Sequence, residues 1–204
     1  MSTKGEITRT RILDAAQDII LDYSYSGMSV DGLIGQLGLT KGAFFHHFDS
    51  KNDLARTLIR RFADEGIAML GEMHERALRL SNDPLQQLLI LVGLYIEEFE
   101  GLTEPYPGCL LAAYVYEMQQ FDDDVRDIIN SEFLAWRELL TAQIERIKLR
   151  YPPREEVSTE ALADMFLSTF EGAFIMSKSL REPDITAEQL KLYRSFIAAL
   201  FRPA

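Results

Sequence analysis

The stretch QLGLTKGAFFHHFDSK, residues 36–51, places a glycine break before a dense group of basic and aromatic side chains. The adjacent histidines His46 and His47 raise the question of a metal site, because imidazole is a common metal ligand. Lys41 and Lys51 raise the question of a nucleic-acid site, because cationic side chains bind phosphates. The rest of the chain helps to decide between these two interpretations.

The composition favours a folded protein of the cytoplasm. Of the 204 residues, 47% are hydrophobic and 26% are charged, which is enough apolar material for a buried core. The chain has no run of 18 uncharged apolar residues, and its start, MSTKGEITRTRILDAAQ, lacks the apolar centre of a signal peptide. The single cysteine, Cys109, cannot form an internal disulfide and fits a reducing compartment. We therefore expect a cytoplasmic location and no membrane partner.

The negative charge is concentrated in the C-terminal two-thirds of the chain. The net charge is −11, but residues 1–61 hold eight Lys/Arg and seven Asp/Glu, whereas residues 62–204 hold 13 and 25. A DNA duplex would be repelled by the second part and tolerated by the first.

Helical periodicity runs through the first 80 residues. Apolar residues recur at spacings of three and four over residues 12–23 and 30–37, and Gly38 follows the second run. Thr40 can cap a third, short helix whose apolar face is formed by Phe44 and Phe48. Ser50, with Asp53 three residues later, has the spacing of a capping box and opens a fourth helix.

The remaining sequence predicts further helices and no strands. The first of these, after Pro84, is apolar almost all round and is expected to be buried. Prolines at 105 and 107 and the Tyr151-Pro152-Pro153 sequence interrupt the helical pattern. The chain is therefore predicted to be all-α, with later helices at about residues 84–99, 108–120, 125–147, 156–180 and 186–201.

A short helix, a glycine turn and a second short helix form a candidate helix-turn-helix. On a helical wheel of residues 41–48, Phe44 and Phe48 face inward, and the small residues Gly42 and Ala43 face outward with His46. Small residues let a helix enter the major groove closely, and Ala43 could touch a thymine methyl group.

The sequence VDGLIGQLGLTKGAFFHHFDSKNDL, residues 30–54, resembles the N-terminal DNA-binding domain of the TetR family of transcriptional regulators. The family pattern is Lys-Gly-x-x-Tyr-x-His-Phe in the recognition helix, with a lysine a few residues later. Phe45 takes the place of the tyrosine, whose hydroxyl commonly holds a phosphate. The matching residues are Lys41, Gly42, His47, Phe48 and Lys51. The resemblance implies a DNA-binding domain at 1–50 and a helical effector-binding and dimerisation domain at 51–204.

The resemblance also implies which residues contact DNA. Phe45 is either a partly exposed packing residue or a contact to sugar. Adjacent histidines on a helix point about 100° apart and no Cys or carboxylate cluster has ligand spacing, so we expect no metal and no cofactor. The predicted DNA-contacting residues are Thr40, Lys41, Gly42, Ala43, Phe45, His46, His47 and Lys51.

A palindromic DNA site needs a two-fold symmetric protein. In the TetR-like architecture the last two long helices build a four-helix interface between two copies, so we expect a homodimer. The alternative is that the core of one copy consumes these side chains. The apolar residues in question are Leu162, Met165, Phe166, Phe170, Ala173, Phe174, Tyr193, Ile197, Leu200 and Phe201.

The middle helices are expected to enclose a pocket for a small-molecule effector, because aromatic and methionine side chains suit an adaptable apolar cavity. Glu117 is interpreted as a solvated carboxylate. Cys109 follows Tyr-Pro-Gly in the first turn of a helix, and TetR-like regulators that sense electrophiles or oxidants are similar here; an inert buried thiol is the other interpretation. The candidate ligand-binding residues are Tyr95, Phe99, Cys109, Tyr114, Met118, Trp136, Phe166 and Phe170.

The function predicted from these features is a ligand-responsive, dimeric repressor. A small apolar or electrophilic effector would release it from a palindromic operator in double-stranded DNA. One alternative is a constitutive helix-turn-helix protein without an effector. Another is a helical small-molecule-binding protein or enzyme, although no nucleophile–base pair, metal cluster or phosphate-binding loop supports an enzyme.

Overall fold

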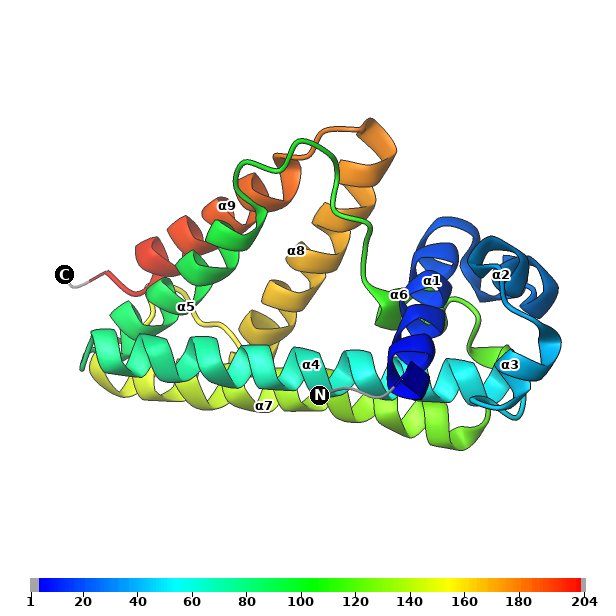
Figure 1. Cartoon of the computed structure of the whole chain (residues 1–204). Helices are drawn as coiled ribbons and strands as arrows, with labels where there is room; N and C mark the ends of the chain where they lie inside the picture. Colours follow the sequence, from blue (N-terminus) through cyan, green and yellow to red (C-terminus); the bar gives the residue numbers. More distant parts are fainter. Residues whose placement is uncertain (1–3, 203–204) are drawn as a thin grey trace. The chain divides into compact units, whose positions relative to one another are not determined.

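The structure is a computed structural model that describes residues 4–202, and within this range every regular element is a helix (Figure 1). The predicted all-α fold is confirmed. The elements are α1 (Lys4–Gly27), α2 (Val30–Leu37), α3 (Lys41–Phe45), α4 (Lys51–Leu80), α5 (Pro84–Phe99), α6 (Leu110–Val115), the 3₁₀ helix η1 (Met118–Gln120), α7 (Asp123–Arg150), α8 (Thr159–Leu180) and α9 (Ile185–Leu200).

The helices form two compact units. Unit 1 holds residues 4–65 and 109–131, and unit 2 holds residues 66–108 and 132–202. The long helices α4 and α7 therefore contribute residues to both units. The domain boundary predicted after residue 50 concerns which part binds DNA, and it stays a prediction.

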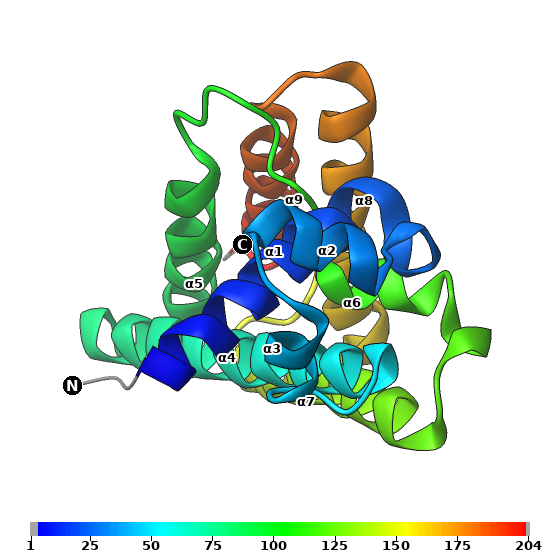
Figure 2. The same ribbon diagram turned by 45° about the vertical axis from the view of Figure 1, so that its right-hand side comes forward.

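Unit 1 combines α1, α2 and α3 with the beginning of α4 and with α6 (Figure 2). The inward residues of α1 and α2 repeat at helical spacing, and Ile12, Ala16 and Leu33 are all fully buried. Phe44 of α3 and Phe48 just after it are buried as predicted. These few aromatic and aliphatic side chains attach the short α3 to the rest of unit 1.

Side-chain caps start the short helices where the sequence predicted them. Thr40 Oγ1 accepts a hydrogen bond from the Ala43 N–H at 3.1 Å, and Ser50 Oγ accepts one from the Asp53 N–H at 3.0 Å. Asp53 Oδ2 in turn accepts from the Asp49 N–H at 3.0 Å, one residue before the usual position in a capping box. Both predicted helix starts are confirmed.

The end of α1 differs from the prediction. The periodic pattern assigned Tyr23 to the apolar face, but Tyr23 is 71% exposed and Tyr25 is buried instead. Ser24 has φ 70° and ψ 166°, so the helix breaks at this residue and the following side chains change direction. A pattern that assumes a continuous helix therefore predicts the wrong tyrosine.

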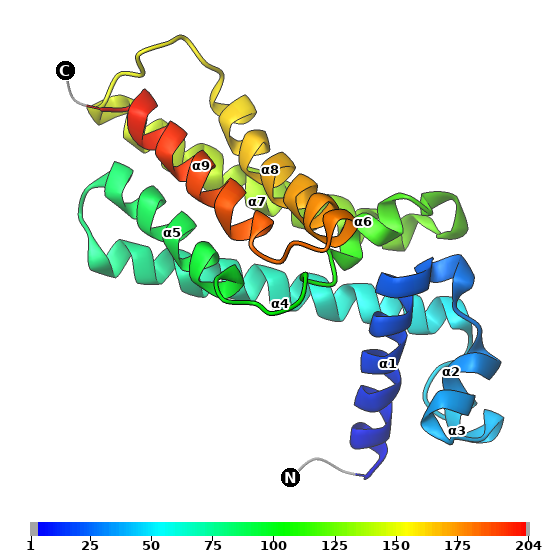
Figure 3. The ribbon, with the colours of Figure 1, turned by 90° about the horizontal axis from the view of Figure 1, so that it is seen from above.

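Unit 2 is built around α5, α8 and α9. Figure 3 shows α9 lying between the other two, in contact with both. The prediction that α5 is buried is confirmed, and its Leu88 packs in a core that includes Leu190 and Ile197 of α9. The tight packing of these apolar faces makes unit 2 a stable frame for the side chains that it encloses.

Two predicted helices have different bounds in the structure. The helix expected over residues 108–120 is divided into α6 and η1, because the backbone turns at Tyr116 and Glu117 and directs Glu117 towards the end of α1. The helix expected from residue 156 begins at Thr159, because Ser158 Oγ accepts from the Ala161 N–H at 3.2 Å and caps it there.

Two glycines beside the turn between α2 and α3 are predicted to respond to alanine in opposite ways. Gly38 caps α2 with φ +66°, so Gly38→Ala should destabilise the protein by about 1–2 kcal/mol. Gly35 lies inside α2 with no atom within 4 Å of an added Cβ, so Gly35→Ala should stabilise it by about 1 kcal/mol. Urea unfolding of both variants measures this difference, and equal effects would contradict the left-handed cap.

Candidate functional site

The segment α2–turn–α3 presents one polar face and buries one aromatic face. Phe44 and Phe48 are 0% and 1% exposed, and their ring centroids lie 5.8 Å apart. Phe45 is 51% exposed and rests edge-on against Phe44 at 5.2 Å. Phe45 is therefore packed on one side and accessible on the other, which is compatible with both roles considered for it.

The polar face consists of six of the eight residues predicted to contact DNA. Thr40, Lys41, Gly42 and His46 are exposed, and Ala43 and His47 are partly exposed. The His46 and His47 ring centroids lie 5.0 Å apart at an interplanar angle of 68°. The structure therefore leaves this face of α3 open to a partner.

The two lysines of this segment have different surroundings. Lys41 Nζ lies 2.9 Å from Asp31 Oδ1, and both side chains are mainly exposed. Such an exposed pair contributes little stability. Lys51 Nζ instead donates to the Tyr25 carbonyl at 2.7 Å and lies 4.0 Å from the Tyr25 ring centroid. Burial lowers the pKa of Lys51, and the nearby Glu117 carboxylate opposes this shift.

Glu117 binds the backbone just after the break in α1. Its Oε1 accepts from the Tyr25 N–H at 2.7 Å, and its Oε2 accepts from the Ser26 N–H at 3.0 Å and from the Ser26 hydroxyl. Lys51, at the start of α4, donates to the Tyr25 carbonyl. The side chains of Glu117 and Lys51 therefore bind the backbone polar groups that the break in α1 leaves without helical partners. The interpretation of Glu117 as a solvated carboxylate is wrong, because Glu117 is partly buried and ties α1 to the segment between α6 and η1.

Aromatic packing surrounds this contact. The Tyr114 and Phe121 rings stack at 4.5 Å and 6°, and Phe121 also lies 4.6 Å from the Tyr25 ring. The Tyr25 hydroxyl donates to Asn52 Oδ1 at the start of α4, and the Tyr114 hydroxyl donates to the Ala55 carbonyl at 3.3 Å. Burial raises the pKa of Tyr25 and of Tyr114, so both phenols stay protonated donors at neutral pH.

The candidate ligand-binding residues divide between the two units. Tyr114 and Met118 belong to unit 1, and Cys109 lies at the start of α6 as its N-cap, partly buried. The others form one aromatic cluster in unit 2, in which Tyr95 is surrounded at 5.3–6.0 Å between ring centroids. The members of this aromatic cluster are Tyr95, Phe99, Trp136, Phe166 and Phe170.

The described residues contain neither a helix suited to cross a membrane nor a cluster suited to hold a metal ion. Over residues 4–202, no helix combines the length and the apolar character needed to cross a bilayer. In the same range, no group of three or more His, Cys, Asp or Glu side chains is placed to hold a metal ion.

Two family models match this sequence, one near its N-terminus and one over its later helices. Residues 12–58 match "Bacterial regulatory proteins, tetR family", and residues 84–192, more than half of the chain, match "Tetracyclin repressor-like, C-terminal domain". The chain belongs to the TetR family of transcriptional regulators. It is a DNA-binding regulator of the repressor type and not an enzyme, as the sequence predicted.

Known relatives of this TetR regulator align along most of its length. The HTH-type transcriptional repressor DhaR of Mycobacterium sp. (strain GP1) is 23% identical over 170 residues, covering 83% of this chain and 82% of the relative. The transcriptional regulator AcuR of Cereibacter sphaeroides is 25% identical over 180 residues, covering 88% and 80%.

Solved structures share the fold. A TetR-family regulator from Agrobacterium tumefaciens has a TM-score of 0.78 and 22% identity, covering 95% of this chain and 98% of that one. The reduced form of Escherichia coli NemR has a TM-score of 0.74 and 18% identity, covering 97% and 99%. At these identities the likeness establishes the fold alone.

Sequence reasoning missed the polar groups that the TetR fold brings inward. Tyr25 and Glu117 are 92 residues apart, and no local pattern indicates that they meet. The sequence pattern could have indicated that Glu132 is buried, because it lies between Ile129 and Trp136 on the apolar face of α7. A carboxylate at such a position indicates either a buried polar network or a site.

The contact made by Glu117 has a predicted pH dependence. Burial raises the pKa of Glu117, but hydrogen bonds from Ser26 and Tyr25 lower it by more, so the folded pKa lies below its ordinary value of 4.5. Glu117→Gln should lower stability at pH 7 by about 1–2 kcal/mol, since it removes hydrogen bonds to an ionised acceptor. The contribution of the parent carboxylate is present above pH 4.5 and is lost as the pH falls through the folded pKa.

Urea unfolding of the parent and of Glu117→Gln between pH 7 and pH 3.5 tests this sign, and the difference between them should shrink towards acid. Asp123→Asn, which changes a 99% exposed carboxylate nearby, is the control and should stay close to the parent. A difference that is constant with pH would show that the ionised carboxylate is not what holds the end of α1.

Proposed function

We propose that this TetR regulator is a homodimeric repressor that binds a palindromic operator and is released from it by a small-molecule effector. The observation that carries the proposal is the exposed polar face of α3 above the buried Phe44 and Phe48. The repressor DhaR, similar along 82% of its own length, supports repression as the outcome. Its action on the chromosome would place the protein in the cytoplasm.

The DNA contacts divide by chemistry. Gly42 and Ala43 lie on the exposed side of α3, where small side chains allow the backbone to approach base edges. Lys41 would exchange Asp31 for a phosphate. Lys51 keeps two ammonium N–H donors besides the one given to Tyr25, which suffices for a second phosphate.

Most of the apolar residues of α8 and α9 that the sequence suggested for dimerisation are not exposed to a second copy. Of that set, all but Met165 and Phe170 are buried within unit 2 itself, because α9 lies against both α5 and α8. A different apolar face of α8 and α9 is exposed. Its members are Met165, Ile175, Met176, Leu180, Leu192 and Phe196.

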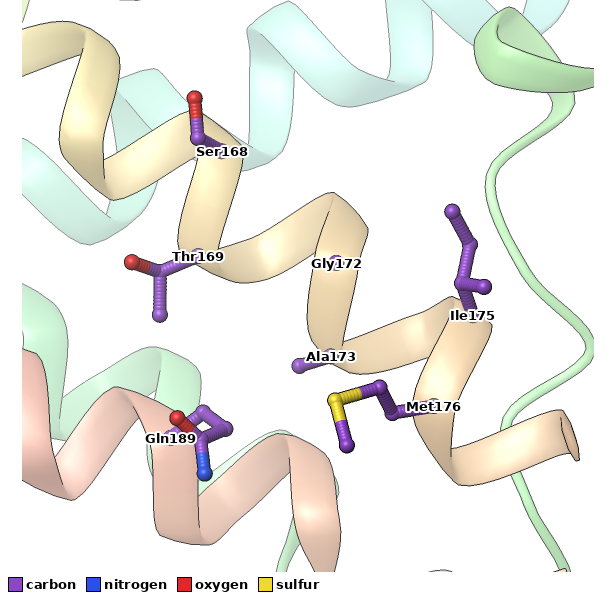
Figure 4. A pocket seen from close by; sticks show the side chains of 7 residues that line it. All are labelled: Ser168, Thr169, Gly172, Ala173, Ile175, Met176 and Gln189. Atoms are coloured by element: carbon purple, nitrogen blue, oxygen red, sulfur yellow. The ribbon is translucent and has the colours of Figure 1, made fainter. Parts of the chain in front are cut away.

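A groove of about 420 Å³ lies between α8 and Gln189 of α9, and Ile175 and Met176 of the exposed face are among the residues that line it (Figure 4). Thr169, Ala173 and Met176 of α8 lie on the side that faces Gln189 of α9, and Gly172 adds no side chain. Small residues flanked by methionine suit the insertion of side chains from an identical face. We therefore assign this face to a second copy of the chain, which would give a four-helix interface.

Effector binding would act through the helices that the two units share. α4 is one continuous helix with residues 51–65 in unit 1 and 66–80 in unit 2. It would therefore transmit a change in unit 2 to unit 1. A coupling of about 1–3 kcal/mol would change operator affinity about 5–150-fold. The two recognition helices would then no longer fit major grooves about 34–36 Å apart. Cys109, partly exposed at the start of α6, is the residue on which an electrophilic effector would act.

Operator binding tests the DNA-contacting face. Fluorescence anisotropy with the intergenic DNA upstream of the gene should show tight, salt-dependent binding that a random duplex does not reproduce. Lys41→Ala should weaken binding and reduce the slope of log K against log[salt] by about one unit, because one phosphate contact is lost.

Lys191→Ala is the matched control, since Lys191 lies on α9 and pairs with Glu100. This variant should keep the parent slope. An unchanged slope for Lys41→Ala would remove Lys41 from the phosphate contacts, and equal affinity for operator and random duplex would count against sequence reading by α3.

Dimerisation is tested by placing a charge on the exposed face of α8 and α9. Phe196→Glu should shift the protein from dimer to monomer in light scattering at micromolar concentration, because the carboxylate would be buried without a partner. Leu149→Glu replaces an 89% exposed apolar residue elsewhere and should remain dimeric. A monomeric parent protein, or a dimeric Phe196→Glu variant, would contradict this interface.

A further inference from the structure

Arg9 of α1 is a basic residue outside the set predicted to contact DNA, although it lies close to α3. Its guanidinium carbon lies 5.1 Å from the centroid of the Phe48 ring. Phe48 follows shortly after α3 and is 1% exposed, so its ring is fixed in the core of unit 1. Figure 3 shows α3 beside the N-terminal half of α1. A cationic group of α1 is thereby placed next to the segment that carries the polar face.

The register of α1 explains the position of Arg9. This residue precedes Ile12 by three positions and Leu13 by four, so it continues the buried face of the helix by one turn. Arg9 itself is exposed, because the core ends at this turn. The stem of an arginine can cover apolar surface while its charged group stays in water. Arg9 therefore reaches Phe48 from the edge of the core and keeps its guanidinium accessible.

No carboxylate competes for this guanidinium within residues 4–202, because Arg9 forms no ion pair there, whereas Lys41 does. The charge of α1 also changes sign along the helix. Residues 4–11 hold three basic residues and one acidic residue, and residues 12–27 hold three acidic residues and no basic one. The positive charge of α1 is therefore concentrated in the half that carries Arg9.

A second basic side chain lies against the same ring. The His47 ring centroid is 6.5 Å from that of Phe48, at an interplanar angle of 57°. His47 belongs to the polar face and is partly exposed. The Phe48 ring therefore has one basic group from α1 and one from the polar face around it, which makes Arg9 a neighbour of that face.

The chemistry of a stacked guanidinium suits a phosphate. The ring face attracts the cation and fixes the plane of the guanidinium, and the N–H donors at its edge stay free. Such donors can bind two oxygens of one phosphate at once. An exposed arginine without a carboxylate partner, held beside a face predicted to bind DNA, is arranged for this contact.

We infer that Arg9 contacts a phosphate of the DNA backbone beside the bases that α3 reads, which extends the DNA-contacting face from α3 to α1. The inference rests on the proposed DNA binding and adds a contact to it. A phosphate contact carries no sequence information. Arg9 would therefore strengthen binding to the operator and to a random duplex by the same factor.

Arg9→Met tests the contact, because methionine keeps an unbranched apolar stem against Phe48 and removes the charge. Fluorescence anisotropy is measured over a range of salt concentrations with the intergenic duplex upstream of the gene and with a random duplex. Arg9→Met should reduce the slope of log K against log[salt] by about one unit for both duplexes, and should weaken binding about tenfold at about 0.1 M salt. Arg9→Lys should keep the slope and weaken binding about threefold, because lysine cannot bind a phosphate bidentately.

Arg11→Met is the matched control. It removes the same charge from the same half of α1, and Arg11 is also exposed. Residues two positions apart on a helix point about 200° apart, so Arg11 lies on the side of α1 away from Phe48. Arg11→Met should keep the parent slope. Urea unfolding of each variant checks that it is folded, and Arg9→Gln takes over the slope test if Arg9→Met is not.

A folded Arg9→Met variant with the parent slope would overturn the inference. An Arg11→Met variant that loses as much slope as Arg9→Met would do the same, because the effect would then come from the general charge of α1. A loss of preference for the operator at an unchanged slope would show that Arg9 only positions α3 through Phe48, and this result would also overturn the phosphate contact.

The random duplex separates this inference from the proposed function. A parent protein that binds both duplexes equally, with a slope that falls by about one unit in Arg9→Met, would keep the phosphate contact and remove sequence reading. A parent protein that selects the intergenic duplex, with no change of slope in Arg9→Met, would keep the regulator and remove Arg9 from its DNA contacts.

Discussion

The contact between Glu117 and the backbone of Tyr25 and Ser26 is the constraint on which the organisation of unit 1 depends. α1 breaks at Ser24, and a break exposes N–H and C=O groups that must find partners. Glu117 takes the N–H groups, and Lys51 takes the Tyr25 carbonyl. One peptide segment is thereby held by the start of α4 and by the residues after α6. The helix-turn-helix segment of α2 and α3 belongs to the same unit.

Unit 2 also buries polar groups. Its helices enclose Glu132 and Tyr95 among aromatic rings, and Tyr95 retains a hydroxyl without a partner within residues 4–202. A core that served only stability would favour phenylalanine at this position, because burying an unpaired hydroxyl has a free-energy cost. Helices α4 and α7 contribute residues to both units.

Local patterns predicted what depends on neighbouring residues. Thr40 and Ser50 cap their helices through residues three positions away, and Phe44 and Phe48 share a face because they are one turn apart. The same reasoning failed where distant segments decide the result. Tyr23 is exposed because α1 breaks, and α6 is shortened because Glu117 turns to α1. Most of the apolar residues expected at the dimer interface are buried because α9 lies between α5 and α8.

The sequence by itself determined the helical class, the helix-turn-helix, the family resemblance and the separation of charge along the chain, since each is encoded in residue type and short spacing. Only the tertiary structure decided that Lys51 donates a hydrogen bond to the Tyr25 carbonyl and that Glu117 accepts one from the Tyr25 N–H. The same holds for the buried position of Glu132 next to Gly66 and Trp136. The physical reason is that hydrogen bonds and burial act between atoms that are close in space. Residues 92 positions apart, such as Tyr25 and Glu117, become neighbours only when the helices pack.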